Sequence, residues 1–244
     1  MRVQDARGFR VVKVCDDGGT IYRSEDDRTI PPPPPARPKA EASQPADFNA
    51  IWSRCFNACT MQMADDLASE LGLRKGITLS LVGLGWHPEL ESWVFPMYAP
   101  DLETVVGLRT RDREGNKRAI RGSKQGLFGY PTVLDGCTEL LVCEGPTDTA
   151  AAIEMGFQAV GRPSCTGAAD MIREISENRN VVIVSDADEP GRKGADSLAK
   201  KLHRFARSTK IVRPPAKDMR DWYADGAGRS AMRFLIDNAS MCHA

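Results

Sequence analysis

From Thr138 onward, short apolar runs alternate with helical segments, and this alternation constrains the fold more than any other feature. The apolar runs are 140–143, 157–160, 180–185 and 210–212, and helical patterns fall at about 146–155, 168–177 and 194–207. Strands that are apolar on both faces belong to parallel sheets with helices on each side. The sequence therefore predicts an α/β fold with a parallel sheet flanked by helices.

The chain upstream of this region reads as three parts. Residues 31–46 hold a run of five prolines and are expected to form an extended linker. Residues 1–30 contain two apolar runs around an Asp-Gly turn, which indicates a hairpin. Residues 47–136 combine a helical stretch at 47–75 with strand-like runs at 93–98, 104–111 and 118–121. We expect a small mixed α+β subdomain at 47–136, the parallel-sheet domain at 137–224 and a last helix within 225–244.

Composition narrows the function classes. The 244 residues carry 33 Lys plus Arg and 33 Asp plus Glu, so the net charge is 0. This balance excludes a basic coat protein but not a nucleic-acid substrate. The 7 cysteines show no disulfide framework, and Cys55 with Cys59 is read as two thiols on a helix face. The chain start is not signal-like and no run approaches ~20 apolar residues, so we expect a cytoplasmic protein with no membrane contact.

Carboxylates follow two of the predicted strands directly. Glu144 and Gly145 come after Leu140–Cys143, and Asp186 and Asp188 come after Val181–Ser185. Ligands of open α/β sheets bind at the carboxyl ends of strands, and clustered carboxylates repel one another unless a cation neutralises them. Oxygen ligands favour Mg²⁺ or Mn²⁺. Each acid taken alone could instead form a turn or cap a helix, but the joint pattern predicts a metal site for phosphoryl transfer.

These residues resemble a known domain. Leu141–Asp148 and Val182–Gly191 are similar to the two acidic motifs of the Toprim domain, which primases, topoisomerases and some nucleases share. The resemblance implies that Glu144 is a general acid/base or metal ligand and that Asp186 and Asp188 hold Mg²⁺. It also implies that Asp148 and Asp218 are further metal ligands: Asp148 matches another acidic position of the primase version, and Asp218 is the first aspartate of a Lys-Asp-x-x-Asp-like element at 217–221. A solvated helix N-terminus is an equal alternative for Asp218.

The region before the Toprim-like motifs indicates which of these protein families the chain resembles most. The segments that look similar to the RNA-polymerase core of bacterial and phage-type DNA primases, in the same order, are 94–97, 105–111, 117–118 and 124–129. The zinc-ribbon ligands of such primases are not found here. Template recognition by a zinc module is therefore either absent or supplied by a separate zinc-binding chain, and a replicative helicase is a possible partner.

Basic residues gather just upstream of the acidic motifs. Residues 105–124 carry a net charge of about +5, from seven Lys or Arg against two acids. Such a strip would bind template phosphates or an incoming triphosphate; the alternative is a strand edge guarded by charge. The candidates for nucleotide or nucleic-acid binding are Arg109, Arg111, Lys117, Arg121 and Lys124.

Together these features predict a Toprim primase-like nucleotidyltransferase. It would make short primers on a single-stranded DNA template from nucleoside triphosphates, with Glu144, Asp186 and Asp188 as catalytic residues and Mg²⁺ or Mn²⁺ as cofactor. A phage or other mobile element is the expected setting. Two alternatives remain open: a Toprim metal-dependent nuclease, and a non-catalytic nucleic-acid-binding accessory of a mobile-element replication complex.

Overall fold

The computed structural model describes residues 9–14, 20–24 and 46–242, which belong to two compact units, Met1–Gln44 and Pro45–Ala244. In the first unit, β1 (Phe9–Val14) pairs antiparallel with β2 (Thr20–Ser24). The turn expected between them lies outside the described residues, as does nearly all of the expected linker. No helix in the described ranges is long and apolar enough to cross a membrane.

The second unit begins with three helices where the sequence predicted one helical stretch. They are α1 (Phe48–Ala58), α2 (Met61–Glu70) and α3 (Gly76–Leu81). The break between α1 and α2 arises because Thr60 caps α2: its hydroxyl accepts a hydrogen bond from the Met63 N–H at 3.2 Å. The chain leaves α2 through Gly72, whose φ of +71° is a left-handed conformation that favours glycine.

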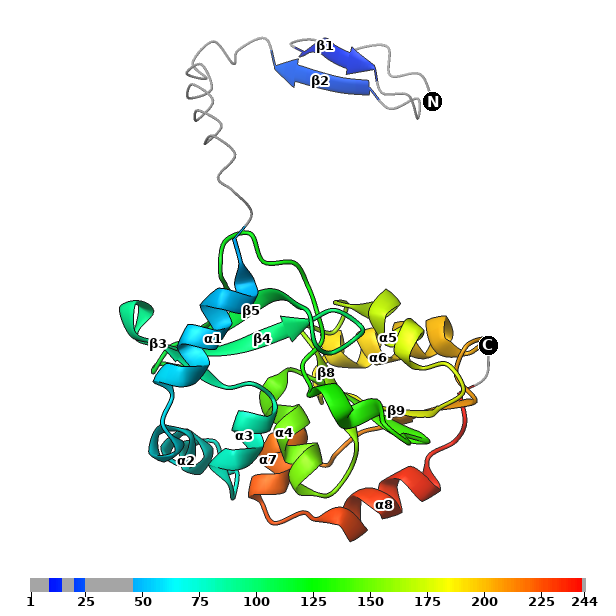
Figure 1. Ribbon diagram of the computed structural model, residues 1–244. Helices are drawn as coiled ribbons and strands as arrows, with labels where there is room; N and C mark the ends of the chain where they lie inside the picture. Colours follow the sequence, from blue (N-terminus) through cyan, green and yellow to red (C-terminus); the bar gives the residue numbers. More distant parts are fainter. Residues whose placement is uncertain (1–8, 15–19, 25–45, 243–244) are drawn as a thin grey trace. The chain divides into compact units, whose positions relative to one another are not determined.

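An antiparallel sheet follows these helices, with strand order β3-β4-β5-β6. Figure 1 labels three of its strands, β3, β4 and β5. Its strands are β3 (Gly85–His87), β4 (Ser92–Tyr98), β5 (Val105–Arg111) and β6 (Lys117–Ala119), and a short 3-10 helix, η1 (Pro88–Leu90), connects β3 to β4. A second such turn, η2 (Pro131–Leu134), leads to the next sheet. Buried residues of α1 pack against one face of the antiparallel sheet and those of α2 and α3 against the other.

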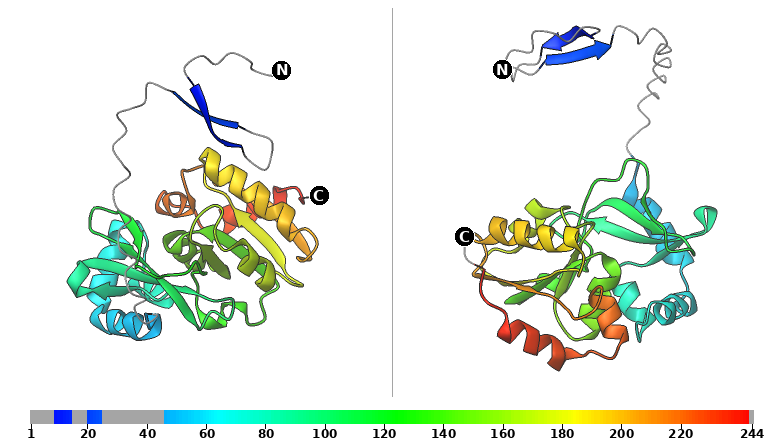
Figure 2. Two further views of the ribbon diagram at one scale, coloured as in Figure 1. Left: turned by 90° about the horizontal axis from the view of Figure 1, so that it is seen from above. Right: turned by 180° about the vertical axis from the view of Figure 1, so that it is seen from behind.

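The parallel sheet has the order β10-β9-β7-β8. Its strands are β7 (Glu139–Glu144), β8 (Ala159–Arg162), β9 (Asn180–Val184) and β10 (Ser208–Val212). Helices α4 (Pro146–Glu154), α7 (Met219–Ala224) and α8 (Arg229–Asn238) cover one face, and α5 (Ala169–Ile175) and α6 (Glu189–Leu202) cover the other (Figures 1 and 2). The predicted parallel α/β sheet flanked by helices, with an antiparallel part before it, is confirmed.

Several boundaries in this part of the chain differ from the sequence prediction, most clearly those of β8 and α6. β8 was expected at 157–160 and lies at Ala159–Arg162. Helix α6 was expected from 194 and begins at Glu189 because Asp188 caps it, accepting a hydrogen bond from the Gly191 N–H at 2.7 Å.

Main-chain hydrogen bonds join the two sheets. Phe128 and Gly161 of β8 exchange two N–H···O bonds of 2.8 Å, and Leu127 and Tyr98 of β4 exchange two more of 2.8 Å. Neighbouring residues of one short segment therefore pair with both sheets. Phe128 is also fully buried, in a core that both parts of the unit share.

Candidate active site

The parallel sheet brings acidic residues to the carboxyl ends of its two central strands. β7 ends at Glu144, and Gly145 then takes a φ of +94° before α4 begins at Pro146. This left-handed conformation suits glycine and turns the chain sharply out of the strand. Asp186 follows the end of β9 by two residues. Because β7 and β9 are adjacent and parallel, the two acids lie at the same edge of the sheet.

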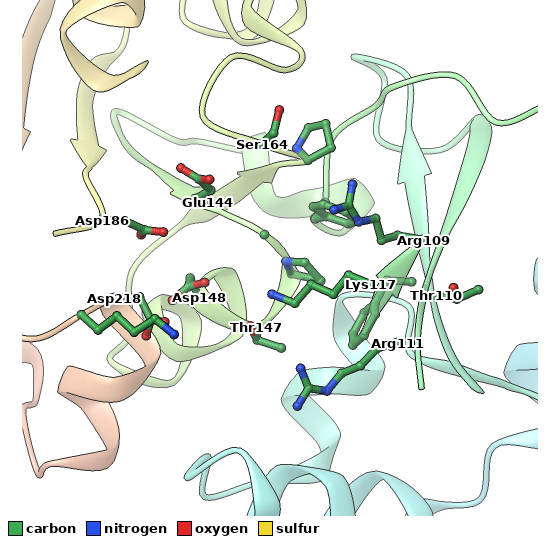
Figure 3. Close-up of a pocket in the computed structure, with 16 residues that line it drawn as sticks. Arg109, Thr110, Arg111, Lys117, Glu144, Thr147, Asp148, Ser164, Asp186 and Asp218 are labelled. Atoms are coloured by element: carbon green, nitrogen blue, oxygen red, sulfur yellow. The ribbon is translucent and has the colours of Figure 1, made fainter. Parts of the chain in front are cut away.

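A pocket of about 270 Å³ lies over this edge and faces the antiparallel sheet (Figure 3). Its acidic side consists of Glu144, Asp148, Asp186 and Asp218. Its basic side, from β5 and β6, consists of Arg109, Arg111 and Lys117. The structure thus places four of the predicted acidic residues opposite three of the predicted basic ones across a single pocket.

Burial and repulsion between neighbouring carboxylates raise the pKa values of acidic residues in this pocket. Burial raises the pKa of Asp186 to about 7, with further increases from Glu144 and Asp218, while Lys117 opposes the shift. The pKa of Glu144 is also raised, mainly by burial, and the nearby Arg162 guanidinium lowers it. Near pH 7 the protonation state of this side of the pocket is therefore sensitive to any cation that enters.

Asp148 lies deepest on the acidic side. It belongs to the first turn of α4 and is only 6% exposed. Burial, with Asp218 next, raises the pKa of its carboxyl to about 8, although its Oδ1 accepts a hydrogen bond from the Arg220 N–H at 3.0 Å. Its charge is thus suppressed unless a cation lies close to it.

Two of the predicted acids also cap helices. Asp188 caps α6 and is not among the described residues that line the pocket, but its charge raises the pKa values of Glu144 and Asp186. Asp218 caps α7: its Oδ1 accepts from the Asp221 N–H at 2.8 Å. The helix-capping alternative therefore holds at both positions, and Asp218 faces the pocket as well.

The basic side is built by strand register. Arg109 and Arg111 are two residues apart on β5, so they share a face, and Lys117 of β6 is the register partner of Arg111. Arg121 and Lys124 lie exposed beyond β6 and are not among the described residues that line the pocket. The predicted basic strip therefore separates into pocket residues and surface residues.

The sequence of the parallel-sheet part matches a known family. Residues 141–225 match the family described as Toprim-like. This segment is a Toprim-like domain. The comparison with curated proteins finds no match for the chain.

Solved structures extend the similarity beyond the Toprim-like domain. The Escherichia coli primase catalytic core is 16% identical with a TM-score of 0.63, covering 79% of this chain and 79% of that chain. The RNA polymerase domain of Mycobacterium tuberculosis primase is 17% identical with a TM-score of 0.60, over 79% and 82%. The primase fragment of the bacteriophage T7 primase-helicase protein is 18% identical with a TM-score of 0.53, over 67% and 69%. At these identities the likeness shows the fold: that of a primase core.

The Toprim-like domain implies a divalent cation, and the donor set fits one in chemistry. The acidic side offers only oxygen donors, which suit Mg²⁺ or Mn²⁺ better than zinc. Burial and the neighbouring carboxylates raise the pKa of Asp186 to about 7, and a cation at this place would offset both effects. Within the described ranges, no three Asp, Glu, His or Cys side chains lie in an arrangement that would hold a metal ion. The carboxylates must therefore reorient to bind one.

Sequence reasoning missed two cations of the Toprim-like domain. Arg162 ends β8 as the register partner of Glu144, is 2% exposed, and donates to the Cys165 carbonyl. An arginine at the end of an apolar run needs a buried partner, and that signal was overlooked because the strand was expected to end at Val160. Lys217, which precedes Asp218, also lines the pocket.

Proposed function

We propose that this chain is a primase-like nucleotidyltransferase that makes short primers on single-stranded DNA. The observation that carries the proposal is the opposition of an acidic side and a basic side in one pocket between the two sheets (Figure 3). A metal-dependent phosphoryl transfer needs carboxylates for the cation and positive side chains for the phosphates. The similarity to primase cores supports this reading over a Toprim nuclease, because it covers 79% of this chain and so extends well beyond the Toprim-like residues 141–225.

The acidic residues of the pocket would bind the cation and accept a proton. Glu144, Asp148 and Asp186 would hold Mg²⁺ or Mn²⁺, with Asp218 beside them and Asp188 orienting α6. The bound cation would neutralise the triphosphate and lower the pKa of the primer 3′-hydroxyl. Glu144, whose own pKa is raised by burial, would accept the proton of that hydroxyl.

The basic side would position the substrate. Arg109 and Arg111 offer planar guanidinium groups for phosphate oxygens, and Lys117 offers a single mobile ammonium. Lys117 is exposed, and its charge already lowers the pKa of Asp186. It therefore bridges the acidic side and an incoming triphosphate. Arg121 and Lys124, exposed beyond β6, would contact template phosphates outside the pocket.

The test is primer synthesis by the full chain. Purified protein, single-stranded templates of varied sequence, labelled ribo- or deoxynucleoside triphosphates, and Mg²⁺ or Mn²⁺ should give short labelled products. Asp186→Asn should abolish them. Asp196→Asn is the matched control, because Asp196 is an exposed acid of α6 whose side chain is 55% exposed and which is not among the described pocket residues.

Each outcome separates the candidate functions. No product with any template, nucleotide or divalent cation contradicts the primase proposal. Metal-dependent loss of the template without nucleotides supports a nuclease. Salt-sensitive single-strand binding that survives Asp186→Asn, without synthesis, supports an accessory role. A zinc-binding template-recognition chain or a replicative helicase added to the reaction should raise the yield of primers if either is the physiological partner.

A further inference from the structure

A second pocket, of about 270 Å³, lies beside α2 on the antiparallel sheet. The aromatic residues that line it are Trp86 of β3 and Trp93 of β4. Met63 and Leu67 of α2 are apolar lining residues, and Arg113 also lines the pocket. The two indole rings meet edge to face, with centroids 4.9 Å apart and planes at 67°. Both tryptophans are partly exposed, so the ring surfaces are accessible to a ligand.

This indole pocket and the carboxylate pocket lie on one face of the sheet. In the strand register, Trp86 pairs with Trp93, Trp93 with Arg111, and Arg111 with Lys117. Register partners in antiparallel strands project from the same face, so these four side chains form one row across β3, β4, β5 and β6. Three strand spacings of about 4.8 Å separate Trp86 from Lys117, or roughly 14 Å. The row begins at the two indole rings and ends at Lys117, whose charge acts on Asp186.

Positive charge follows the row. The Arg113 guanidinium lies 5.6 Å from the centroid of the Trp86 ring and is exposed, with no ion pair to any described residue. Arg111 contacts Glu70 at 3.6 Å, yet its Nε is buried and has no hydrogen-bond partner in the described part of the chain. A buried donor without a partner is rare and indicates a missing acceptor.

The acidic residues at this pocket are already engaged. The Glu70 carboxylate is paired with Arg111, and Asp66 accepts a hydrogen bond from the Gln62 amide at 2.8 Å. A ligand with a flat aromatic surface and an anionic chain therefore meets indole rings and cations rather than unpaired carboxylates.

We propose that the Trp86–Trp93 pocket stacks an unpaired base of single-stranded nucleic acid whose backbone follows Arg113, Arg111 and Lys117 to the carboxylates. The proposal deepens the proposed function, since it names how the same strand is held outside the reaction site. Bases inside a duplex are already stacked on each other, so the ligand is a single strand. At a helical spacing of about 3.4 Å per nucleotide, the stacked base lies about four nucleotides from Lys117, or fewer if the strand is extended.

The test measures binding without catalysis. The full chain is titrated against a fluorescently labelled single-stranded oligonucleotide in buffer with a chelator and no nucleotides, and anisotropy is recorded. Trp86→Ala should weaken binding about 5- to 140-fold, the equivalent of ~1–3 kcal/mol for one stacked base. Trp86→Phe should retain most of the affinity, because a smaller aromatic ring still stacks.

Salt dependence distinguishes the base contact from the phosphate contacts. Trp86→Ala should leave the slope of log K against log salt unchanged, whereas Arg113→Ala should reduce it by about 0.7. Phe234→Ala is the matched control, because Phe234 of α8 is an aromatic residue that is 67% exposed and lies away from both pockets. It should bind as the unmodified chain does.

Three results overturn the proposal: unchanged affinity in a folded Trp86→Ala protein, equal loss in Trp86→Ala and Trp86→Phe, or tighter binding of a duplex than of the single strand. Circular dichroism of each variant establishes that it is folded. Failure of primer synthesis with the Trp86 effect intact removes the proposed activity alone. Primer synthesis without the Trp86 effect removes this inference alone.

Discussion

Arg162→Met removes a buried guanidinium at the end of β8, beside Glu144 of the acidic side. Arg162 is 2% exposed, donates to the Cys165 carbonyl, and faces the negative charge of Glu144 and Asp186. Met keeps most of the apolar volume, so packing changes little. The variant therefore loses one charge-assisted hydrogen bond and one set of buried charge–charge attractions.

The two losses depend differently on pH. The hydrogen bond to the carbonyl contributes ~1.5–3 kcal/mol at any pH at which the protein folds. The attraction to Glu144 exists only when that carboxyl is ionised, and water at the half-buried Glu144 reduces it to ~1 kcal/mol. Since the pKa of Glu144 is raised and that of Asp186 is about 7, this second part is absent at low pH and grows as pH rises toward 8. We expect a loss of ~2 kcal/mol at pH 4.5 and ~3 kcal/mol at pH 8.

Urea unfolding of the full chain from pH 4.5 to 8, with a chelator present, measures both parts. Arg179→Met is the matched control, because Arg179 donates to three carbonyls, those of Leu134, Ile175 and Cys137, and forms no ion pair with a described residue. Its loss of stability should be constant across this range. Parallel pH profiles for the two variants would refute the electrostatic reasoning.

Three further predictions follow from single contacts. Without metal, ionisation of Asp148 opposes folding because its pKa in the folded protein is raised to about 8. The free energy of unfolding should therefore fall as the pH rises from 4 through 8, by at most ~1.4 kcal/mol per pH unit, and urea titrations of Asp148→Asn should show a smaller fall. Gly161→Ala should cost ~1–3 kcal/mol of stability, because its Cβ would lie 2.4 Å from Thr149 Oγ1, whereas Gly228→Ala, with nothing within 4 Å, should not; equal melting temperatures contradict this. Arg233→Met should cost ~1 kcal/mol, lost at high salt, because it removes a two-pronged ion pair to β7 at 2.5 and 3.0 Å that is partly exposed.

The parallel sheet could be predicted because its strands are apolar on both faces, a pattern that few other structures produce. A last helix was expected within 225–244, and α8 lies in that range, at Arg229–Asn238. The short elements α3 and β3 were not predicted, and α7 was predicted only as the helix N-terminus that was one alternative for Asp218. These three elements span 6, 3 and 6 residues, too few for a period to be visible, and their conformation depends on tertiary contacts such as the Gly76 N–H donating to Asp65.

The acidic residues of the site could be predicted because strand ends fix where they meet. The opposing basic side could not be placed, because Arg109, Arg111 and Lys117 reach the pocket only through the packing of one sheet against another. Arg113 is two residues beyond Arg111, the spacing that keeps side chains on one face of a strand, but β5 ends at Arg111 and the Arg113 guanidinium lies over the Trp86 ring. Alternation holds only while the strand continues.

The segment Leu127-Phe128 has a consequence for how such a protein can change over time. It bonds β4 on one side and β8 on the other through backbone atoms alone. Most side-chain substitutions leave backbone hydrogen bonds in place, so substitutions in either sheet should change the distance between the acidic and basic sides little. Pocket residues can then be exchanged one at a time, as nucleotide or template preference changes, without resetting the distance across which they act.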